Sequence, residues 1–238
     1  MKEGLIDKIK SRGYWRINLQ PNTMKIRLDN LSNCESIVER NSVNLRGWDF
    51  PHIPKGKEEH GIINRYQSFV ESWSDWSGYK EFWRMYKDGQ FLCYRGLRED
   101  WFEEHLYHSE WASTFKPKEY LGVLYSVIYE VTEFYVFSSR LSQEGLYDDG
   151  LVINIHLKNI FDRQLWLEDN HRIAFLFNKK TSAPELLFSK TYNQNDMIEK
   201  YQYFAREIIS DVFDSFGWNP SHDIIISEQE KLLNRKLL

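Results

Sequence analysis

Bulky apolar and polar side chains alternate along much of the first hundred residues, and this two-residue period is typical of half-buried β-strands. The strongest local signal is Asp88-Gly89, which lies between two aromatic-rich runs, residues 79–86 and 91–97. Both turn residues tolerate the positive φ of a type I′ turn, so the pattern predicts a β-hairpin. Bulky side chains on both faces of its first strand indicate that the hairpin is covered on both sides. The alternation places four residues of that strand on one face: Tyr79, Glu81, Trp83 and Met85. Further strands are expected at 13–19, 42–46 and 62–73.

Longer helical patterns dominate the second half of the chain. Pro117 suits the first turn of a helix, and nearly every face of the segment that follows is apolar. Because a helix that is apolar all round must be packed on several sides, we expect a central helix over residues 116–143. A second long helix follows Asn193 or Asn195, keeps a helical period and ends at Gly217. Short helices are also expected near the N-terminus and from about Ser227. Another runs to about Arg40, and Asp29, Asn30 and Ser32 are its candidate N-caps.

Short apolar runs separated by turn-forming residues fill the segment between the two long helices. We expect them to form a second antiparallel sheet, with strands at 151–157, 164–167, 173–177 and 186–189. The order of strands, helix, strands and helix predicts an α+β fold, in which antiparallel sheets pack around a long central helix. With 238 residues and 42% hydrophobic side chains, the chain can bury one core. A single compact domain over residues 1–238 is therefore expected, and two units that meet near residue 115 are the alternative.

Composition and charge exclude several classes of function. The formal net charge is −4, so the chain as a whole gives no electrostatic case for nucleic acid binding, and only a local patch could serve. Cys34 and Cys93 lack the spacing of a zinc site or of a disulfide framework, and two unpaired thiols suit a reducing compartment. No apolar run resembles a signal peptide or approaches the ~20 residues that span a bilayer. We expect a cytoplasmic protein with no membrane association, no bound metal and no cofactor.

An aromatic, arginine-rich block carries the first candidate site. Six of the nine tryptophans lie in one quarter of the chain, and the block begins with the loop at residues 45–53. In this loop Arg46 offers a bidentate fork and Trp48 a stacking face. Asp49 offers an acceptor or a base, and His52 a group that titrates near neutral pH. The alternative interpretation is structural: Trp48 anchors the core, Arg46 pairs with Asp49, and His52 caps a turn.

A second candidate site follows the hairpin, at Arg95, Arg98 and Trp101. The arginines lie near aromatic residues in the sequence and could supply cation–π or anion contacts. Ion pairs with Glu99 and Asp100 explain them equally well. Together the two candidates predict a ligand-binding cleft bordered by Arg46, Trp48, Asp49, His52, Arg95, Arg98 and Trp101.

Other patterns give little support for catalysis. Glu103-Glu104-His105 with His108 has helical spacing for metal ligands but lacks a third ligand, so a solvated helical face is the better interpretation. Asp148-Asp149 is typical of an exposed turn. The chain has no GxSxG elbow, no GxxxxGK[ST] loop and no GxGxxG motif after a strand. No catalytic residue is assigned from these patterns.

Several segments resemble the region that lies C-terminal to Schlafen/AlbA-type domains, thought to bind DNA, in bacterial proteins. The similar segments are GYWR at 13–16, LRGWDFPH at 45–52, EFWRMY at 81–86 with GQF at 89–91, and FGWN at 216–219. The similarity covers nearly the whole chain, but these motifs carry no assigned chemistry, and no AlbA-like domain lies within the 238 residues. The resemblance implies a bacterial, cytoplasmic sensor or accessory module that acts through a partner, in a regulatory or antiviral defence setting.

Three hypotheses of function follow. The leading one is a non-catalytic module that recognises a small anionic ligand or a partner protein. In it Trp48 stacks on the ligand, Arg46 and Arg98 hold an anion, and Asp49 or His52 fixes the orientation. The second is a metal-dependent hydrolase of a nucleotide or nucleic acid, with Asp49 and His52 as the acid–base pair. The third is direct nucleic acid binding through a local basic patch.

Overall fold

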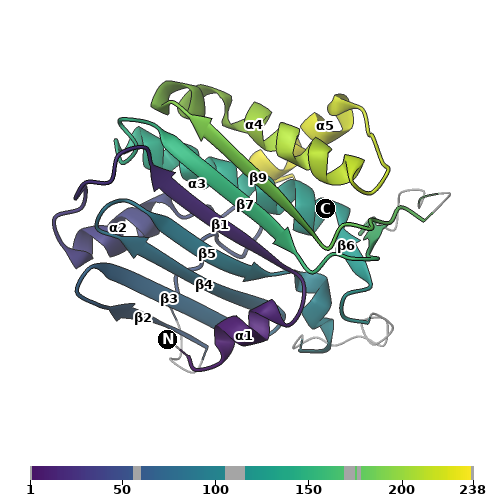
Figure 1. The fold of residues 1–238 in the computed structure, drawn as a ribbon, viewed down its shortest axis with the longest axis horizontal. Coiled ribbons are helices and arrows are strands. Elements are labelled where there is room, and N and C mark those ends of the chain that lie inside the picture. Colours follow the sequence, from purple (N-terminus) through teal and green to yellow (C-terminus); the bar gives the residue numbers. More distant parts are fainter. Residues whose placement is uncertain (1, 56–59, 105–115, 169–174, 176–177, 237–238) are drawn as a thin grey trace.

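A seven-stranded antiparallel sheet runs through the molecule, with the strand order β2-β3-β4-β5-β1-β7-β9 (Figure 1). The computed structural model describes residues 2–55, 60–104, 116–168, 175 and 178–236. The strands are β1 (Tyr14–Pro21), β2 (Gly61–Arg65), β3 (Phe69–Trp76), β4 (Tyr79–Tyr86), β5 (Phe91–Gly96), β7 (Leu151–Lys158) and β9 (Glu185–Tyr192). Strands from both sides of residue 115 therefore belong to one sheet. A parallel pair, β6 (Tyr120–Gly122) and β8 (Gln164–Trp166), forms a small second sheet.

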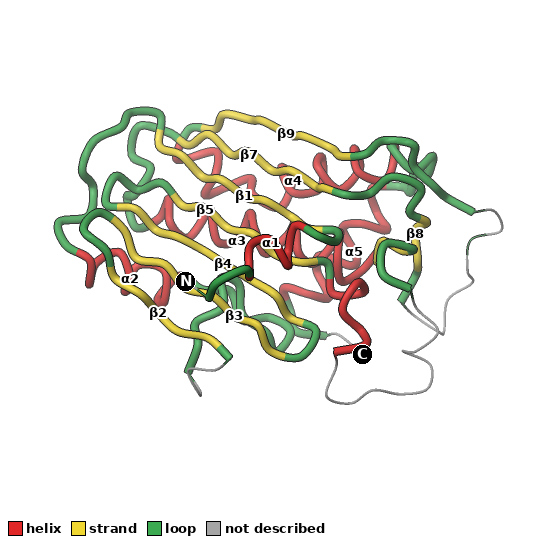
Figure 2. The backbone as a smooth tube through the Cα atoms, turned by 60° about the horizontal axis from the view of Figure 1, so that its bottom comes forward, coloured by secondary structure: helices red, strands yellow, loops and turns green. Residues whose placement is uncertain are grey.

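Long helices pack on one face of the main sheet, and a short helix lies on the other face (Figure 1, Figure 2). The face under the long helices carries Trp15, Ile17 and Leu19, the alternating apolar residues of β1, which are buried in the main core. The helices on this side are α2 (Leu31–Asn41), α3 (Glu130–Gln143), α4 (Gln194–Asp214) and α5 (His222–Leu233). On the opposite face α1 (Leu5–Lys10) packs against Tyr14, Trp73 and Phe82. Among the described residues no helix is long and apolar enough to cross a membrane.

Helix capping follows the sequence closely. The side chain of Asn30 accepts a hydrogen bond of 2.9 Å from the backbone N–H three residues later and caps α2. Asn193, one of the two predicted caps, does the same for α4 at 2.8 Å. Gly217 follows α4 with a φ of +68°, a left-handed conformation that favours glycine. These three boundaries confirm the predictions, whereas the last helix begins at His222 rather than near Ser227.

The central helix begins later than its apolar pattern predicts. Residues Val123–Tyr129 are π-helical and run directly into α3, so the continuous helix spans 123–143. The predicted start at Pro117 is wrong because residues 117–119 form a turn, and Tyr120–Gly122 is a strand that pairs with β8. Almost every residue of the helix is buried, as a central position requires.

The predicted hairpin is present, and its two faces are those expected from the alternation. Tyr79, Glu81, Trp83 and Met85 point to the helix-covered side, while α1 covers part of the other side. The predicted type I′ turn is wrong, since only Gly89 has a positive φ. The N–H of Gly89 donates to the carbonyl of Tyr86, and the N–H of Tyr86 donates to the carbonyl of Gln90. This pattern belongs to a three-residue loop with a glycine bulge.

The α+β class is confirmed, but the predicted second antiparallel sheet is wrong. β7 pairs with β1 over eight residues and β9 pairs with β7, so both strands extend the first sheet. The apolar residues of β7 alternate in register with those of β1, which gives the two strands one shared buried face. The expected strand at 42–46 is reduced to a single bridge between Val43 and Phe50, and the run 62–73 divides into β2 and β3. The strand expected at 173–177 lies outside the described residues, apart from Phe175.

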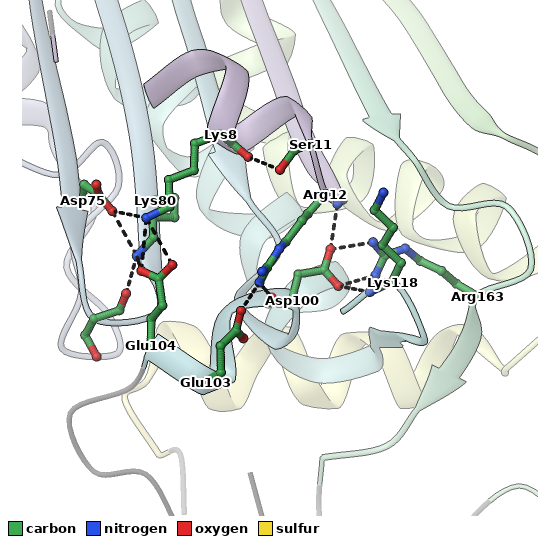
Figure 3. A network of polar contacts seen from close by, with 12 residues as sticks. Lys8, Ser11, Arg12, Asp75, Lys80, Asp100, Glu103, Glu104, Lys118 and Arg163 are labelled. Atoms are coloured by element: carbon green, nitrogen blue, oxygen red, sulfur yellow. Dashed lines mark hydrogen bonds and ion pairs between the residues drawn. The ribbon is translucent and has the colours of Figure 1, made fainter. Parts of the chain in front are cut away.

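Asp100 joins three segments at one end of the sheet (Figure 3). It lies in a 3₁₀ helix (Arg98–Glu104) and is 1% exposed. Its carboxylate accepts the backbone N–H groups of Gly13 and Lys118, both at 2.6 Å. The same carboxylate pairs with both terminal nitrogens of Arg163, at 2.9 and 2.5 Å, and this arginine is fully buried. One side chain therefore fixes the start of β1 and the segments that precede β6 and β8.

We expect Asp100→Ala to lower the free energy of unfolding by about 3–5 kcal/mol, because Arg163 would stay buried without its counter-charge. Urea unfolding followed by tryptophan fluorescence measures this change. Lys200→Ala is the control, since it removes an exposed ion pair with Asp196 within α4 and should leave the free energy of unfolding nearly unchanged. Equal unfolding midpoints for the two variants would contradict the structural role of Asp100.

Candidate functional site

The loop at residues 45–53 is fixed to α3 by a buried arginine. Nε and Nη2 of Arg46 donate to the two carboxylate oxygens of Glu133, at 3.0 and 2.8 Å. Nη1 of Arg46 donates to the carbonyl of Tyr125 at 3.2 Å. Such a two-pronged contact fixes direction as well as distance. The loop is also closed on itself by a bridge between Val43 and Phe50, with hydrogen bonds of 2.7 and 2.9 Å.

Further ion pairs continue from this contact into the sheet. Glu130, one turn before Glu133, lies 3.6 Å from Arg46 and accepts a hydrogen bond of 3.0 Å from Nε of Arg95. Arg95 also pairs with Glu81 at 2.7 Å. Glu81 in turn accepts the backbone N–H of His52 at 2.7 Å, which returns the network to the loop. We call these five side chains, Arg46, Arg95, Glu81, Glu130 and Glu133, the buried ion network.

The buried ion network holds three carboxyl groups but only two guanidinium groups. Burial raises the pKa of Glu130 to about 7, although Arg95 and Arg46 favour its charged form. Its Oε2 atom has no hydrogen-bond partner in the described part of the chain. Glu130 is therefore the member of the network that most readily holds a proton.

Trp48 stands in the middle of a stack of parallel rings. The ring centroid of His52 lies 3.9 Å from that of Trp48, and the centroid of Tyr79 lies 4.2 Å away. Two rings this close cannot share one face of an indole, so they lie on its opposite faces. Trp76, the cross-strand partner of Tyr79, is parallel to Trp48 within 4° at 5.8 Å. His52 is therefore the outer layer of the stack, and both faces of Trp48 are covered.

Asp49 orients the outer ring of this stack. Its Oδ1 atom bonds to Nδ1 of His52, and its Oδ2 atom accepts the N–H of Ile53 at 3.3 Å. Burial alone would raise the pKa of Asp49, but the bond and charge of His52 bring that pKa below its ordinary value. Nε2 of His52 makes no hydrogen bond to any described residue, so it is free to meet a ligand.

A pocket of about 400 Å³ opens beside the stack. Small-molecule sites usually have volumes of ~300–1,000 Å³ and combine apolar walls with a few polar groups. Trp48, Trp76, Ile53, Pro54 and Gly61 supply apolar wall. The polar groups come from Asn44, Asp49, His52, Lys55, His60 and Ser74.

The structure does not bring all seven predicted site residues into this pocket. Trp48, Asp49 and His52 line it. Arg46 and Arg95 lie behind the stack and are held by glutamates, so neither guanidinium borders the pocket. The alternative ion pair between Arg46 and Asp49 is wrong, because Arg46 pairs with Glu133 and Asp49 with His52.

Arg98 and Trp101 lie elsewhere. The guanidinium of Arg98 lies over the rings of Tyr79 and Tyr125, 5.5 Å from each centroid. It borders a cavity of about 10 Å³ together with Trp48 and Glu130, enough for about one water molecule. Trp101 lies beneath α1, where the guanidinium carbon of Arg12 is 4.0 Å from its ring centroid. Three of the four residues of the first candidate thus line a pocket, whereas Trp101 belongs to a different region.

Several residues of the site were not predicted from the sequence. They are the ring partners Trp76 and Tyr79, the pocket residue His60, and the glutamates Glu81, Glu130 and Glu133. The glutamates did leave a signal, since each interrupts an otherwise apolar face of a strand or helix. A charged residue on such a face is buried only with a partner, so it marks an ion pair whose other half lies elsewhere in the chain.

The remaining acidic motifs have structural partners. Asp148 and Asp149 pair with Arg27, and hydrogen bonds from cations lower the pKa of Asp148, the opposite of what a general acid needs. Glu103 pairs with Arg12 and Glu104 with Lys80, while His105 and His108 lie outside the described residues. Within the described ranges, no group of three His, Cys, Asp or Glu side chains could hold a metal ion.

Comparison of the chain with protein-family models, with curated proteins and with solved structures found no match in any of the three. The resemblance to the region that follows Schlafen/AlbA-type domains stays a prediction. The geometry of the pocket is the firmer ground for a proposal of function.

The unfolding free energy should depend on pH through Glu130. Between its ordinary pKa of 4.5 and its folded pKa of about 7, the folded state holds a proton that the unfolded state releases. This contribution is complete below pH 4.5 and is lost as the pH rises through 7, in total about 3 kcal/mol. Glu130→Gln, which keeps an acceptor for Arg95, should remove this part of the decline. Urea unfolding at pH 4.5 and pH 8 measures it.

Glu199→Gln serves as the control for that measurement, because Glu199 is exposed on α4. It should lose as much stability between the two pH values as the wild type does. If Glu130→Gln also follows the wild type, Glu130 does not hold the proton.

Proposed function

We propose that the chain is a non-catalytic recognition module, and that its pocket beside Trp48 binds a small ligand with a planar ring and an anionic group. The observation that carries the proposal is the pocket of about 400 Å³ with an aromatic stack along its wall. Size, aromatic walls and a few convergent polar groups are the general properties of small-molecule sites.

The lining of the pocket favours this class of ligand. His52 and Trp76 are the rings available for stacking, since Tyr79 and His52 cover both faces of Trp48. Lys55 and the imidazole of His52 can meet an anionic group, whereas Asp49, the one acidic residue among the described residues that line the pocket, is bound to His52. This arrangement replaces Arg46 and Arg98 as the predicted anion contacts.

The stack is ordered before any ligand arrives. Arg46 fixes one end of the loop to Glu133, and Glu81 holds the backbone of His52. Ordering of side chains on binding costs about 0.5–1.5 kcal/mol for each flexible group, so a pre-formed wall preserves affinity. The buried ion network therefore supports recognition without contact with the ligand.

The Schlafen/AlbA-type resemblance supports the biological part of the proposal. It favours a bacterial, cytoplasmic module that senses a ligand on behalf of a partner chain, in regulation or antiviral defence. A partner protein that presents an aromatic, anionic group to the same pocket would use the same contacts.

Isothermal titration with AMP, GMP, CMP and UMP tests the ligand class. We expect at least one of these nucleotides to bind the wild type, and His52→Ala to weaken binding about tenfold, or ~1.4 kcal/mol. His222→Ala is the matched control because His222 is exposed in the first turn of α5, and it should bind as the wild type does. Failure of all four probes, or equal binding by both variants, would contradict the proposal.

A second candidate function is favoured by the bond between Asp49 and His52. A carboxylate that orients one imidazole nitrogen and leaves the other free is an arrangement used in general acid–base catalysis. The wild type would then hydrolyse a nucleotide, RNA or DNA when Mg²⁺, Mn²⁺ or Zn²⁺ is added. Chromatography of the products checks this. Turnover that is lost in Asp49→Asn would establish the hydrolase, and binding without turnover would leave the recognition module.

A further inference from the structure

The sheet face that carries α1 is open over β1, β7 and β9. In the described part of the chain α1 contacts β4 and β5, and the long helices lie on the other side of the sheet (Figure 1, Figure 2). Antiparallel sheets commonly leave one face in water, so an open face alone indicates no function. The side chains on this face decide whether it can bind a ligand.

One row of side chains crosses this open face. Strand pairing places Tyr94 of β5, Arg16 of β1, His156 of β7 and Leu187 of β9 side by side. Neighbouring strands are ~4.8 Å apart, so the row is roughly 15 Å long. Leu187 is 60% exposed, and the other three are partly exposed. Lys10 of α1 lies above one end, with its ammonium 5.2 Å from the ring centroid of Tyr94. We call these five residues the Arg16 patch.

Arg16 has no counter-charge among the residues that the structure describes. Its neighbours on this face are Tyr94 and His156 across the strands, and Tyr14 and Asn18 along β1, none of them acidic. No ion pair or hydrogen bond joins its guanidinium to any described residue. The contrast with Arg46, Arg95 and Arg163, which are all paired with carboxylates, is clear.

The charge of Arg16 also lowers the pKa of the neighbouring His156. Partial burial lowers the pKa of His156, and the positive charges of Arg16 and Lys158 lower it further. Lys158 itself pairs with Glu185 at the edge of this region. The Arg16 patch is thus locally positive in a chain whose net charge is −4.

We propose that the Arg16 patch binds single-stranded nucleic acid. An open antiparallel face that combines partly exposed rings with cations suits single strands, because bases of any sequence stack on the rings while phosphates meet the cations. Tyr94 and His156 supply the rings, and Arg16 and Lys10 supply the positive charge. The site lies on the opposite face of the sheet from the Trp48 pocket, so it does not depend on the proposed function.

Fluorescence anisotropy with fluorescein-labelled dT12 and rU12, each in 50 and 200 mM NaCl, tests this site. We expect binding in 50 mM NaCl that weakens steeply with salt, because phosphate contacts release counterions. Arg16→Gln should weaken binding about fivefold and reduce the slope of log K against log[salt] by about 0.7, the loss of one phosphate contact on a single strand. Arg16→Lys keeps the charge and should retain most of the affinity.

Arg40→Gln is the matched control, since it makes the same change of charge at an exposed residue of α2, on the helix-covered side of the sheet. It should bind both oligonucleotides as the wild type does. No binding in 50 mM NaCl, or equal losses in Arg16→Gln and Arg40→Gln, would overturn the proposal. Equally tight binding of a labelled poly-glutamate peptide with the same sensitivity to Arg16→Gln would also overturn it, in favour of an acidic protein partner.

Discussion

The pairing of buried charges constrains this structure more than any other interaction. The guanidinium groups of Arg46 and Arg95 are buried behind the Trp48 stack, and each is stable there only because glutamates meet it. Arg46 pairs with two glutamates of α3, and Arg95 pairs with one glutamate of β4 and one of α3. Removal of one partner from such a pair usually costs about 3–5 kcal/mol, since the other charge is left buried and unpaired. The position of the loop is therefore tied to the positions of the sheet and of the central helix. The buried ion network thus fixes the positions of Trp48 and His52. These two side chains in turn form part of the pocket wall.

The sheet separates two surfaces with different chemistry. On the helix-covered side, Arg46 and Arg95 are paired with glutamates, and the pocket beside Trp48 adds polar groups such as Lys55. On the open side, Arg16 lies among neighbours that are not acidic and makes no ion pair with any described residue. A pre-formed pocket suits a small ligand, and a flat, positive face suits a flexible polyanion. Under the two proposals, the pocket binds a small ligand and the opposite sheet face binds a single-stranded nucleic acid. The two ligands do not compete, because their sites are separate.

Local features of the sequence predicted the local structure well, and long-range contacts explain the failures. Asn30, Asn193 and Gly217 act within a few residues of themselves, so helix ends could be read directly. The pairing of β7 with β1 joins residues at least 130 positions apart, and alternation alone cannot choose a partner strand. The same limit applies to the site. Arg46 pairs with Glu133, which lies 87 residues away in the sequence. The sequence pattern therefore predicted Arg46 as a site residue but could not predict its partner. The two interpretations of the tryptophan block, core packing and binding site, both apply to Trp48. Its ring packs between two others, and it also lines the pocket.

The central claim is that the pocket beside the Trp48 stack is the recognition site. Proton–nitrogen correlation spectra of the protein, labelled at the tryptophan indole nitrogens, test it most directly during titration with nucleoside monophosphates. Single Trp→Phe variants assign the signals. The account predicts that the indole signals of Trp48 and Trp76 move on titration, whereas those of Trp15, in the core, and Trp101, beneath α1, stay in place. Stationary signals for Trp48 and Trp76, or movement confined to Trp101, would contradict it.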